Sequence, residues 1–180
     1  MNVGELKQAV LRNMNEDDLG SIPVELGDEI LSYLNDGYLN AVLTGEKPVK
    51  RKECQAVNGR ISVSELDEDF YDVSRISNRL GQDVGFYCNG EYIFTESGIF
   101  EVEYLFVPPL LTDDSDVPII DEAYHHILSD YATYRMMLKG SRGRQERGNA
   151  FLSEYLAGLR KLGRIRYRTI RNKFGGFLYG

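Results

Sequence analysis

The sequence has too few cysteines for a disulfide framework or a cysteine-rich zinc site. Cys54 and Cys88 are the only two in 180 residues, and two isolated thiols favour a reducing compartment. No stretch approaches the roughly 18 apolar residues that a membrane-spanning helix needs. The first ten residues lack the basic and apolar regions of a secretory signal peptide. These absences predict a soluble protein, without membrane segments, that is made in a cytoplasm.

Histidine is just as scarce, and the two histidines are neighbours. His125 and His126 lie in a predicted helix, where adjacent positions are about 100° apart, so one is expected to pack inward and the other to face solvent. A metal-binding pair on a helix would be spaced by three or four residues. The acidic run at residues 113–116 lacks the alternating ligands, the central glycine and the closing glutamate of a calcium loop. Neither feature predicts a metal site.

Sequence signatures of catalysis are also missing. The glycines of the link at residues 139–148 are not followed by the lysine and hydroxyl residue of a phosphate-binding loop. There is no G-x-S-x-G nucleophile elbow, and nothing singles out a catalytic pair among the 28 acidic residues. We therefore expect no enzymatic activity, no cofactor and no metal.

Charge is plentiful but unevenly distributed. Residues 1–138 contain 10 Lys and Arg against 26 Asp and Glu, a net charge of −16. Residues 139–180 contain 11 against 2, a net charge of +9. Because phosphate binding requires clustered cations, the acidic part cannot itself be a DNA-binding surface. Such an asymmetry is typical of a protein whose basic end has an interaction role.

The basic end finishes in residues 164–180, which we call the basic arm. It mixes cations with aliphatic and aromatic side chains, and its first five residues alternate between the two kinds. Three interpretations remain open: an extended segment that docks on a protein, a surface for single-stranded nucleic acid, or a disordered tail. We favour docking, through Arg164, Arg166, Tyr167, Arg168, Arg171, Lys173, Phe174, Phe177 and Tyr179.

The spacing of apolar residues predicts two pairs of helices. In the first helix, Val3, Leu6, Val10 and Met14 recur every three or four residues. The same period continues in three further segments, and Pro23 and Pro118 stand near the starts of two of them. The predicted helices are residues 3–14, 26–43, 120–138 and 145–162.

Between the two pairs, at residues 49–107, the period changes to two. Asn58-Gly59 and Asn89-Gly90 each separate apolar runs, which predicts antiparallel hairpins with type I′ turns. Residues 100–106 begin with alternating apolar and acidic side chains, as in a half-buried strand. The predicted fold is α+β: a four-helix bundle-like core (residues 1–163), an antiparallel β insertion between the second and third helices, and an extended C-terminal arm.

Four passages resemble the head-to-tail adaptor (connector, or head-completion) proteins of tailed bacteriophages. VGELKQAVLRNMNEDD and DEILSYLNDGYLNAV are similar to the paired N-terminal helices of that family. IFEVEYLFVPPLLTDDSDVPIIDEAYHHILSDYATYRMML is similar to its strand, proline-rich turn and third helix, and NAFLSEYLAGLRKL to its fourth helix. The resemblance covers residues 1–163, more loosely across 45–98.

The resemblance implies a virion protein of the neck, assembled in the host cytoplasm. Such proteins form a ring, usually of twelve copies, beneath the portal protein. The ring extends the channel through which double-stranded DNA is ejected, and it offers a platform to a tail or nozzle protein. Family members use a C-terminal segment to embrace the portal, the position of the basic arm here. An acidic channel wall would repel phosphates and let DNA of any sequence slide past.

Two other functions compete with this interpretation. Another neck or tail-completion subunit would share the resemblance to virion proteins. A nucleic-acid-binding module with a basic arm would explain the charge asymmetry without any ring.

Overall fold

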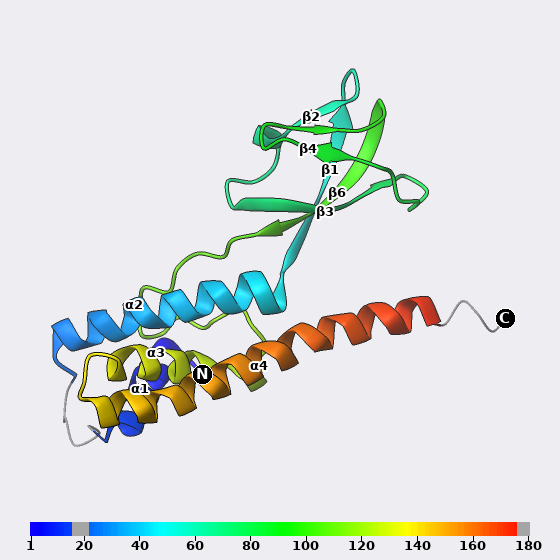
Figure 1. Ribbon diagram of the computed structural model, residues 1–180. Helices are drawn as coiled ribbons and strands as arrows, with labels where there is room; N and C mark the ends of the chain where they lie inside the picture. Colours follow the sequence, from blue (N-terminus) through cyan, green and yellow to red (C-terminus); the bar gives the residue numbers. More distant parts are fainter. Residues whose placement is uncertain (16–21, 176–180) are drawn as a thin grey trace. The chain divides into compact units, whose positions relative to one another are not determined.

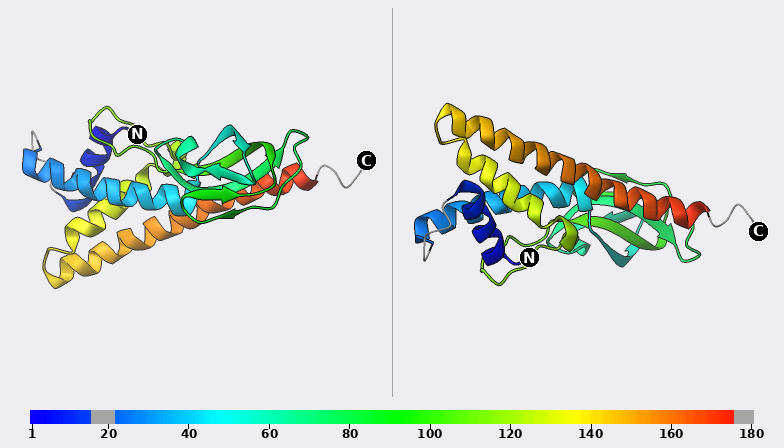
Figure 2. Two further views of the ribbon diagram at one scale, coloured as in Figure 1. Left: turned by 90° about the horizontal axis from the view of Figure 1, so that it is seen from above. Right: turned by 90° about the horizontal axis from the view of Figure 1, so that it is seen from below.

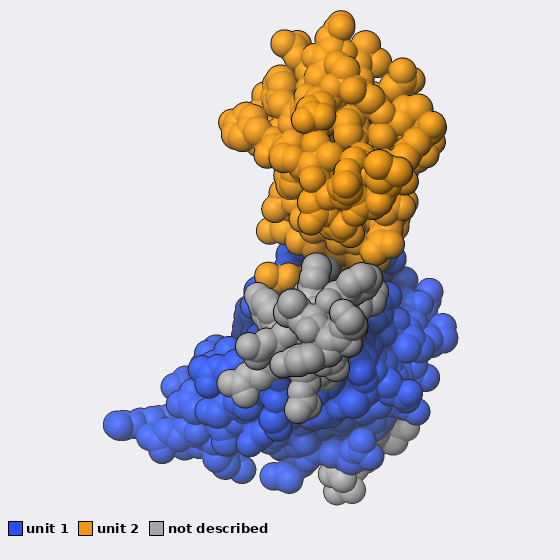
Figure 3. Space-filling view, turned by 90° about the vertical axis from the view of Figure 1, so that its right-hand side faces the viewer, with its two compact units in different colours: residues 1–46, 109–180 blue, residues 47–108 orange. Residues whose placement is uncertain are grey.

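The computed structural model describes residues 1–15 and 22–175, with side chains described as far as Gly163 (Figure 1). The chain divides into two units, coloured separately in Figure 3. Unit 1 comprises residues 1–46 and 109–180, and unit 2 comprises residues 47–108. The β insertion predicted at residues 49–107 therefore forms a unit of its own.

Unit 1 is helical. The helix α1 begins with a capping box, in which the Asn2 side chain accepts the N–H of Glu5 at 2.9 Å and the Glu5 carboxylate accepts the N–H of Asn2 at 3.0 Å. It ends at Asn15, which has a left-handed φ of 58°. Its bounds agree with the prediction. The helices of unit 1 are α1 (Val3–Met14), α2 (Val24–Asn40), the π-helix η1 (Ala41–Glu46), the 3-10 helix η3 (Glu122–Tyr124), α3 (His126–Met137) and α4 (Arg142–Gly175).

The helix α3 lies at the centre of unit 1 and contacts each of the other three α-helices. Its buried residues include Ile127, Leu128, Ala132 and Met136, which occupy more than one side of the helix, as expected for an element with neighbours on several sides. Leu138, the last residue of the predicted helix 120–138, is 40% exposed because it lies just beyond the end of α3. A bundle-like description of this core stays a prediction.

The prediction places the end of the second helix at residue 43, but α2 ends at Asn40. It changes at Ala41 into the π-helix η1, which extends to Glu46. The wider turn places Gly45 directly beneath Leu162 of α4, where an added Cβ would stand 2.8 Å from Leu162 Cδ2. Packing against α4 therefore accompanies the departure from α-helical geometry.

The helix α4 corrects the prediction of an extended C-terminal arm. The predicted helix ended at residue 162, but α4 continues to Gly175 and includes residues 164–175 of the basic arm. Extending an established helix costs no new nucleation, and a single glycine, Gly163, is too weak a signal to end it. The pair Gly175-Gly176 is the first strong stop signal in the sequence. Residues 176–180 lie outside the described part of the chain.

Unit 2 consists of two three-stranded antiparallel sheets, with strand orders β1-β6-β3 and β2-β5-β4. Their buried side chains form a separate apolar core that includes Ile61, Ile76, Ile93, Val102 and Tyr104. The elements are β1 (Val49–Ala56), β2 (Arg60–Ser62), the 3-10 helix η2 (Val63–Glu65), β3 (Phe70–Asn78), β4 (Tyr87–Cys88), β5 (Tyr92–Phe94) and β6 (Gly98–Phe106).

The strand β6 confirms the half-buried strand predicted at residues 100–106. Phe100, Val102 and Tyr104 are buried, whereas Glu101 is exposed. This strand is the centre of its sheet and pairs with β1 on one side and β3 on the other. The first residue of β1, Val49, stands opposite Leu105 near the end of β6.

Only one of the two Asn-Gly turns is of the predicted type. Asn58 and Gly59 have φ values of 52° and 74°, positive at both positions as a type I′ turn requires. At the second turn only Gly90 has a positive φ, 93°. There the Asn89 side chain accepts the N–H groups of Glu91 and Tyr92, at 3.1 and 2.9 Å. Because Cys88 pairs with Ile93 and the Asn89 N–H donates to the Tyr92 carbonyl oxygen at 3.2 Å, the two central residues of this turn are Gly90 and Glu91, one position later than predicted.

Candidate partner-binding surfaces

The basic arm continues from a helix that is anchored deep in unit 1. The hydroxyl of Tyr155, which is 1% exposed, donates to the carbonyl oxygen of Gly37 on α2 at 3.0 Å. Its ring lies 4.8 Å from that of Tyr131 on α3, centroid to centroid. Burial raises the pKa of the Tyr155 hydroxyl, with a smaller effect from Tyr131, and keeps it a donor. One side chain thus joins three helices.

Glycines allow α4 to approach its neighbours closely. A Cβ at Gly158 would overlap the Cγ2 atom of Ile127 on α3. At Gly148, an added Cβ would stand 3.1 Å from Met137 Cβ. One turn beyond Gly158, Leu162 is 2% exposed and packs over Gly45. The described side chains of α4 therefore end in a well-packed contact immediately before the basic arm.

The structure places the predicted docking residues in two groups. Arg164, Arg166, Tyr167, Arg168, Arg171, Lys173 and Phe174 belong to α4. Phe177 and Tyr179 lie outside the described residues. Along the helix, positions 164, 168 and 171 are four and three residues apart, a spacing that shares one face. This part of the arm therefore follows the period of an α-helix. It does not follow the period of two that the sequence suggested for residues 164–168.

The cations just before α4 form ion pairs within unit 1. Arg135 forms an ion pair with Asp36 at 3.1 Å and lies 4.6 Å from the Tyr33 ring centroid. Lys139 pairs with Glu29, and this hydrogen bond lowers the pKa of the Glu29 carboxyl. Within α4, Arg142 pairs with Glu146 on the same helix at 3.2 Å. These contacts fix the link between α3 and α4.

A loop of irregular structure, residues 109–121, is held against α1 and α2; we call it the proline loop. Asn35 of α2 donates to the Leu111 carbonyl oxygen and accepts the Leu111 N–H, both at 2.9 Å. The hydroxyl of Tyr38, one turn further along α2, accepts the N–H of Ile119 at 3.4 Å. The ends of the loop are thus fixed on one helix.

The acidic run within the proline loop has a structural role. The Asp116 carboxylate accepts the N–H groups of Thr112 and Asp113, at 2.7 and 2.9 Å, which lowers its pKa. The backbone carbonyls of Asp114 and Asp116 accept the first N–H groups of α1, those of Gly4 and Val3. The run precedes the third helix in the sequence, and it also caps the first helix. Nothing in the sequence spacing indicates this long-range contact.

An aromatic surface on unit 2 was not predicted as a site. On the outer face of the sheet β2-β5-β4, the Phe94 ring lies 6.1 Å from that of Tyr87 and 6.3 Å from that of Tyr92. The Arg60 guanidinium stands 5.6 Å from the Phe94 ring centroid. Tyr87 is 67% exposed. The alternation around Asn89-Gly90 is the sequence signal that could have revealed this surface, since Ile93 of the same strand points inward.

The two histidines behave as the sequence predicts. His125 is 2% exposed, and its Nε2 atom lies 2.9 Å from the carbonyl oxygen of Ile120, whereas His126 is exposed. Within residues 1–15 and 22–175, no group of three His, Cys, Asp or Glu side chains is arranged to hold a metal ion. No helix in the described part of the chain has an apolar stretch long enough to span a bilayer.

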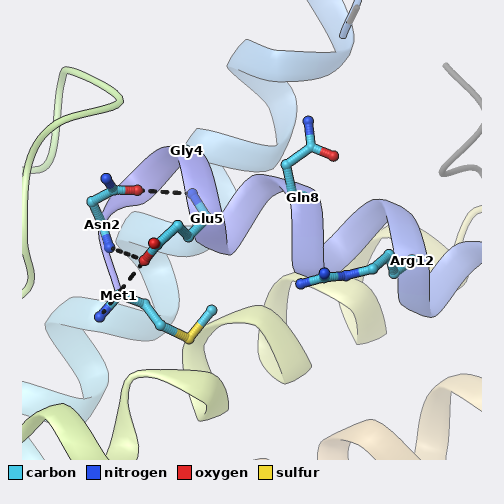
Figure 4. A pocket seen from close by; sticks show the side chains of 6 residues that line it. All are labelled: Met1, Asn2, Gly4, Glu5, Gln8 and Arg12. Carbon is cyan, nitrogen blue, oxygen red and sulfur yellow. Dashed lines mark hydrogen bonds and ion pairs between the residues drawn. The ribbon is translucent and has the colours of Figure 1, made fainter. Parts of the chain in front are cut away.

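A shallow hollow lies along the exposed side of α1 (Figure 4). Its polar side chains include Asn2 and Glu5, whose polar groups are engaged in the capping box. Gln8 and Arg12 line the same side one and two turns further along the helix. This hollow brings together no nucleophile, base or pair of free carboxylates, and we assign it no chemistry.

The described residues offer extended surfaces suited to binding, and one family model matches the chain. The model of the family described as SU10 adaptor protein matches residues 55–174, two thirds of the chain. The chain belongs to this family. It is a bacteriophage structural adaptor protein, and it acts by binding other proteins of the virion. No curated protein matches the chain.

The matched range differs from the range on which the resemblance rests. It includes nearly all of unit 2, where the resemblance is loose, and it omits α1 and α2, on which the resemblance partly depends. It also continues past residue 163 to residue 174 of the basic arm. The family relationship therefore extends into the predicted docking segment.

Proposed function

We propose that this adaptor forms a ring of twelve copies beneath the portal protein and joins the head of a tailed phage to its tail. The observation that carries the proposal is the continuation of α4. From a buried contact at Leu162, the helix runs into a segment with 5 cations and no acidic residue between Arg164 and Lys173. Because the family match includes this segment, we infer that it belongs to the adaptor function.

In this proposal the basic arm docks on an acidic surface of the portal. Exposed ion pairs contribute only about 0–1 kcal/mol each, so the cations alone would give a weak attachment that salt disrupts. Burial of an aromatic side chain contributes more, about 1.5–3 kcal/mol. Phe174, Phe177 and Tyr179 are therefore the proposed anchors, and the cations orient the arm.

The acidic body suits a channel for DNA. Residues 1–138, which comprise unit 2 and all of unit 1 except its basic end, have a net charge of −16. This part of the chain would repel phosphates, so that double-stranded DNA passes without sequence-specific binding. The ring would occupy the neck of the virion, assembled in the host cytoplasm, and a tail or nozzle protein would bind below it.

Removal of the basic arm tests the proposal. A chain that lacks residues 164–180 should remain folded, since Tyr155 and Leu162 keep their contacts, but it should no longer co-sediment with purified portal rings. The same two chains are compared in a DNA-binding assay. If the shortened chain still binds the portal and instead loses affinity for DNA, the nucleic-acid-binding alternative is correct. If neither property changes, another neck or tail-completion role is favoured.

A further inference from the structure

The proline loop exposes apolar side chains although its backbone is firmly held. Leu110, Val117 and Ile119 are 55, 58 and 45% exposed. Their neighbours Leu111 and Asp116 are fixed by hydrogen bonds to α2 and α1. Apolar side chains that stay in water on an ordered backbone are typical of a surface that is covered in an assembly.

A second exposed apolar position lies on α4. Leu156 is 43% exposed, and Arg160, one helical turn further on, is also exposed. The side chain of Leu156 faces away from the buried Tyr155 and Gly158, which contact α2 and α3. The outer face of α4 therefore combines an apolar side chain with a cation.

The two surfaces lie on opposite sides of unit 1. On α2, the carbonyl oxygen of Gly37 accepts from Tyr155 of α4, whereas Asn35 holds Leu111 of the proline loop. Two residues along a helix correspond to a turn of about 200°, so these partners lie on opposite sides of α2. The two views of Figure 2 agree, since α4 and the loop beside the N-terminus are at opposite edges of the helical unit.

Their charges are complementary. Residues 109–122 contain five acidic side chains and no Lys or Arg. Residues 142–163 of α4 contain five cations against two acids. In the described part of the chain, Asp113 and Asp121 form no ion pair with a cation, and Arg160 forms none with a carboxylate. Like surfaces would repel each other, whereas the loop and the helix would attract.

We propose that the outer face of α4 in one copy docks on the proline loop of the next copy. Leu156 would pack among Leu110, Val117 and Ile119, and Arg160 would face the acidic groups of the loop. Contact between two different surfaces is head-to-tail, and such contacts repeat until they close a ring. The inference rests on the proposed function, because it names the two surfaces that join the copies of the proposed ring.

Cysteine cross-linking tests this contact directly. Cys88 is replaced by Ser, and Cys54 is left because it is 5% exposed and burial raises the pKa of its thiol. Val117→Cys and Leu156→Cys are then introduced together, and the full chain is treated with a short bismaleimide. We expect a ladder of multimers of three or more copies. Each single variant alone should give no cross-linked product, and a mixture of the two single variants should give cross-linked dimers but nothing larger.

The control pairs Leu156→Cys with Val24→Cys. Val24 is 74% exposed and lies about 20 Å along α2 from the residue that holds Ile119, so this chain should give no ladder. The inference is overturned if both thiols label with a monofunctional maleimide but no ladder forms, or if Val117→Cys alone forms homodimers. Portal co-sedimentation of the same chains reports on the proposed function separately. Portal binding without a ladder would overturn the docking surfaces alone, and a ladder without portal binding would overturn the proposed place beneath the portal.

Discussion

At the scale of single residues, glycine decides how closely α4 approaches α3. Gly158 meets Ile127 so closely that even a methyl group would overlap it. Gly143, near the start of the same helix, has nothing within 4 Å of an added Cβ. One helix thus holds a glycine that packing requires and another that it does not.

We expect Gly158→Ala to lower the free energy of unfolding by about 1–3 kcal/mol, because the added methyl group must displace Ile127 or the helix. Gly143→Ala is the matched control and should raise stability by up to about 1 kcal/mol, since alanine favours a helix without meeting a neighbour. Chemical denaturation followed by circular dichroism measures both. Equal effects of the two substitutions would contradict the close α3–α4 contact.

Asp130 gives a prediction of pH dependence. Burial raises its pKa to about 6, with the charge of Glu154 adding to the effect and that of His126 opposing it. The folded-state pKa lies above the unfolded value of 3.8, so the folded chain binds this proton more tightly. The stability contributed by this group is therefore present below about pH 4 and is lost as the pH rises through about 6.

Asp130→Asn should consequently stabilise the protein at pH 7.5, by about 1 kcal/mol once solvent screening of the partly exposed carboxyl is allowed for. Near pH 4 the advantage should disappear, because Asp130 is then neutral in the folded chain. Urea denaturation of both chains across this range gives the difference. A constant difference at every pH would show that the carboxyl titrates normally.

At the scale of elements, the Asn58-Gly59 turn connects β1 to β2, and the flanking residues Val57 and Arg60 form an isolated antiparallel bridge. Gly59 has a φ of 74°, and an added Cβ would stand 2.9 Å from the carbonyl oxygen of Thr95. Gly59→Val should lower the free energy of unfolding of unit 2 by about 2–3 kcal/mol, because it adds backbone strain and a clash. Gly90→Val meets no neighbour and should cost less, about 1–2 kcal/mol from its φ of 93° alone. Thermal unfolding that is unchanged in both variants would contradict the turn assignments.

Most element positions followed from local sequence, because their signals are local. The capping residues around Val3–Met14 and the alternation in Phe100–Phe106 are contained within the elements themselves. The contacts that were missed join distant segments. Besides its local capping box, α1 donates its first two N–H groups to the carbonyl oxygens of Asp116 and Asp114, and the π-helix η1 accommodates Leu162. A single sequence carries no local trace of such pairings.

The basic arm shows the same limit in a different way. Composition singled out the residues that are proposed to dock, and this stays a prediction. The alternating start at residues 164–168 indicated a strand, whereas α4 continues through it. Short alternating runs fit both periods, and the preceding helix decides between them. The exposed surfaces on the proline loop and on β2-β5-β4 were also missed, because exposure depends on which face the core occupies.

At the scale of the whole molecule, the proposed attachment to the portal predicts separable effects for the charged and the aromatic residues of the basic arm. We expect Phe174→Ala combined with Phe177→Ala to weaken portal binding at every salt concentration, because apolar burial is insensitive to screening. Replacement of Arg164 and Arg168 by Gln should weaken binding mainly at low salt, where ion pairs contribute most. Co-sedimentation with portal rings over a salt series distinguishes the two. A salt-independent loss on removal of the arginines would contradict the assigned roles.

The pairing of Val49 with Leu105 has a consequence for how this protein can vary. Opposite residues in an antiparallel pair stand about 5 Å apart. The chain therefore enters unit 2 and leaves it at two neighbouring points. We expect that an insertion joined in this way can be shortened, enlarged or replaced without a change in the helices that precede and follow it. A chain in which a glycine-serine linker joins these two points directly should therefore retain the helical unit.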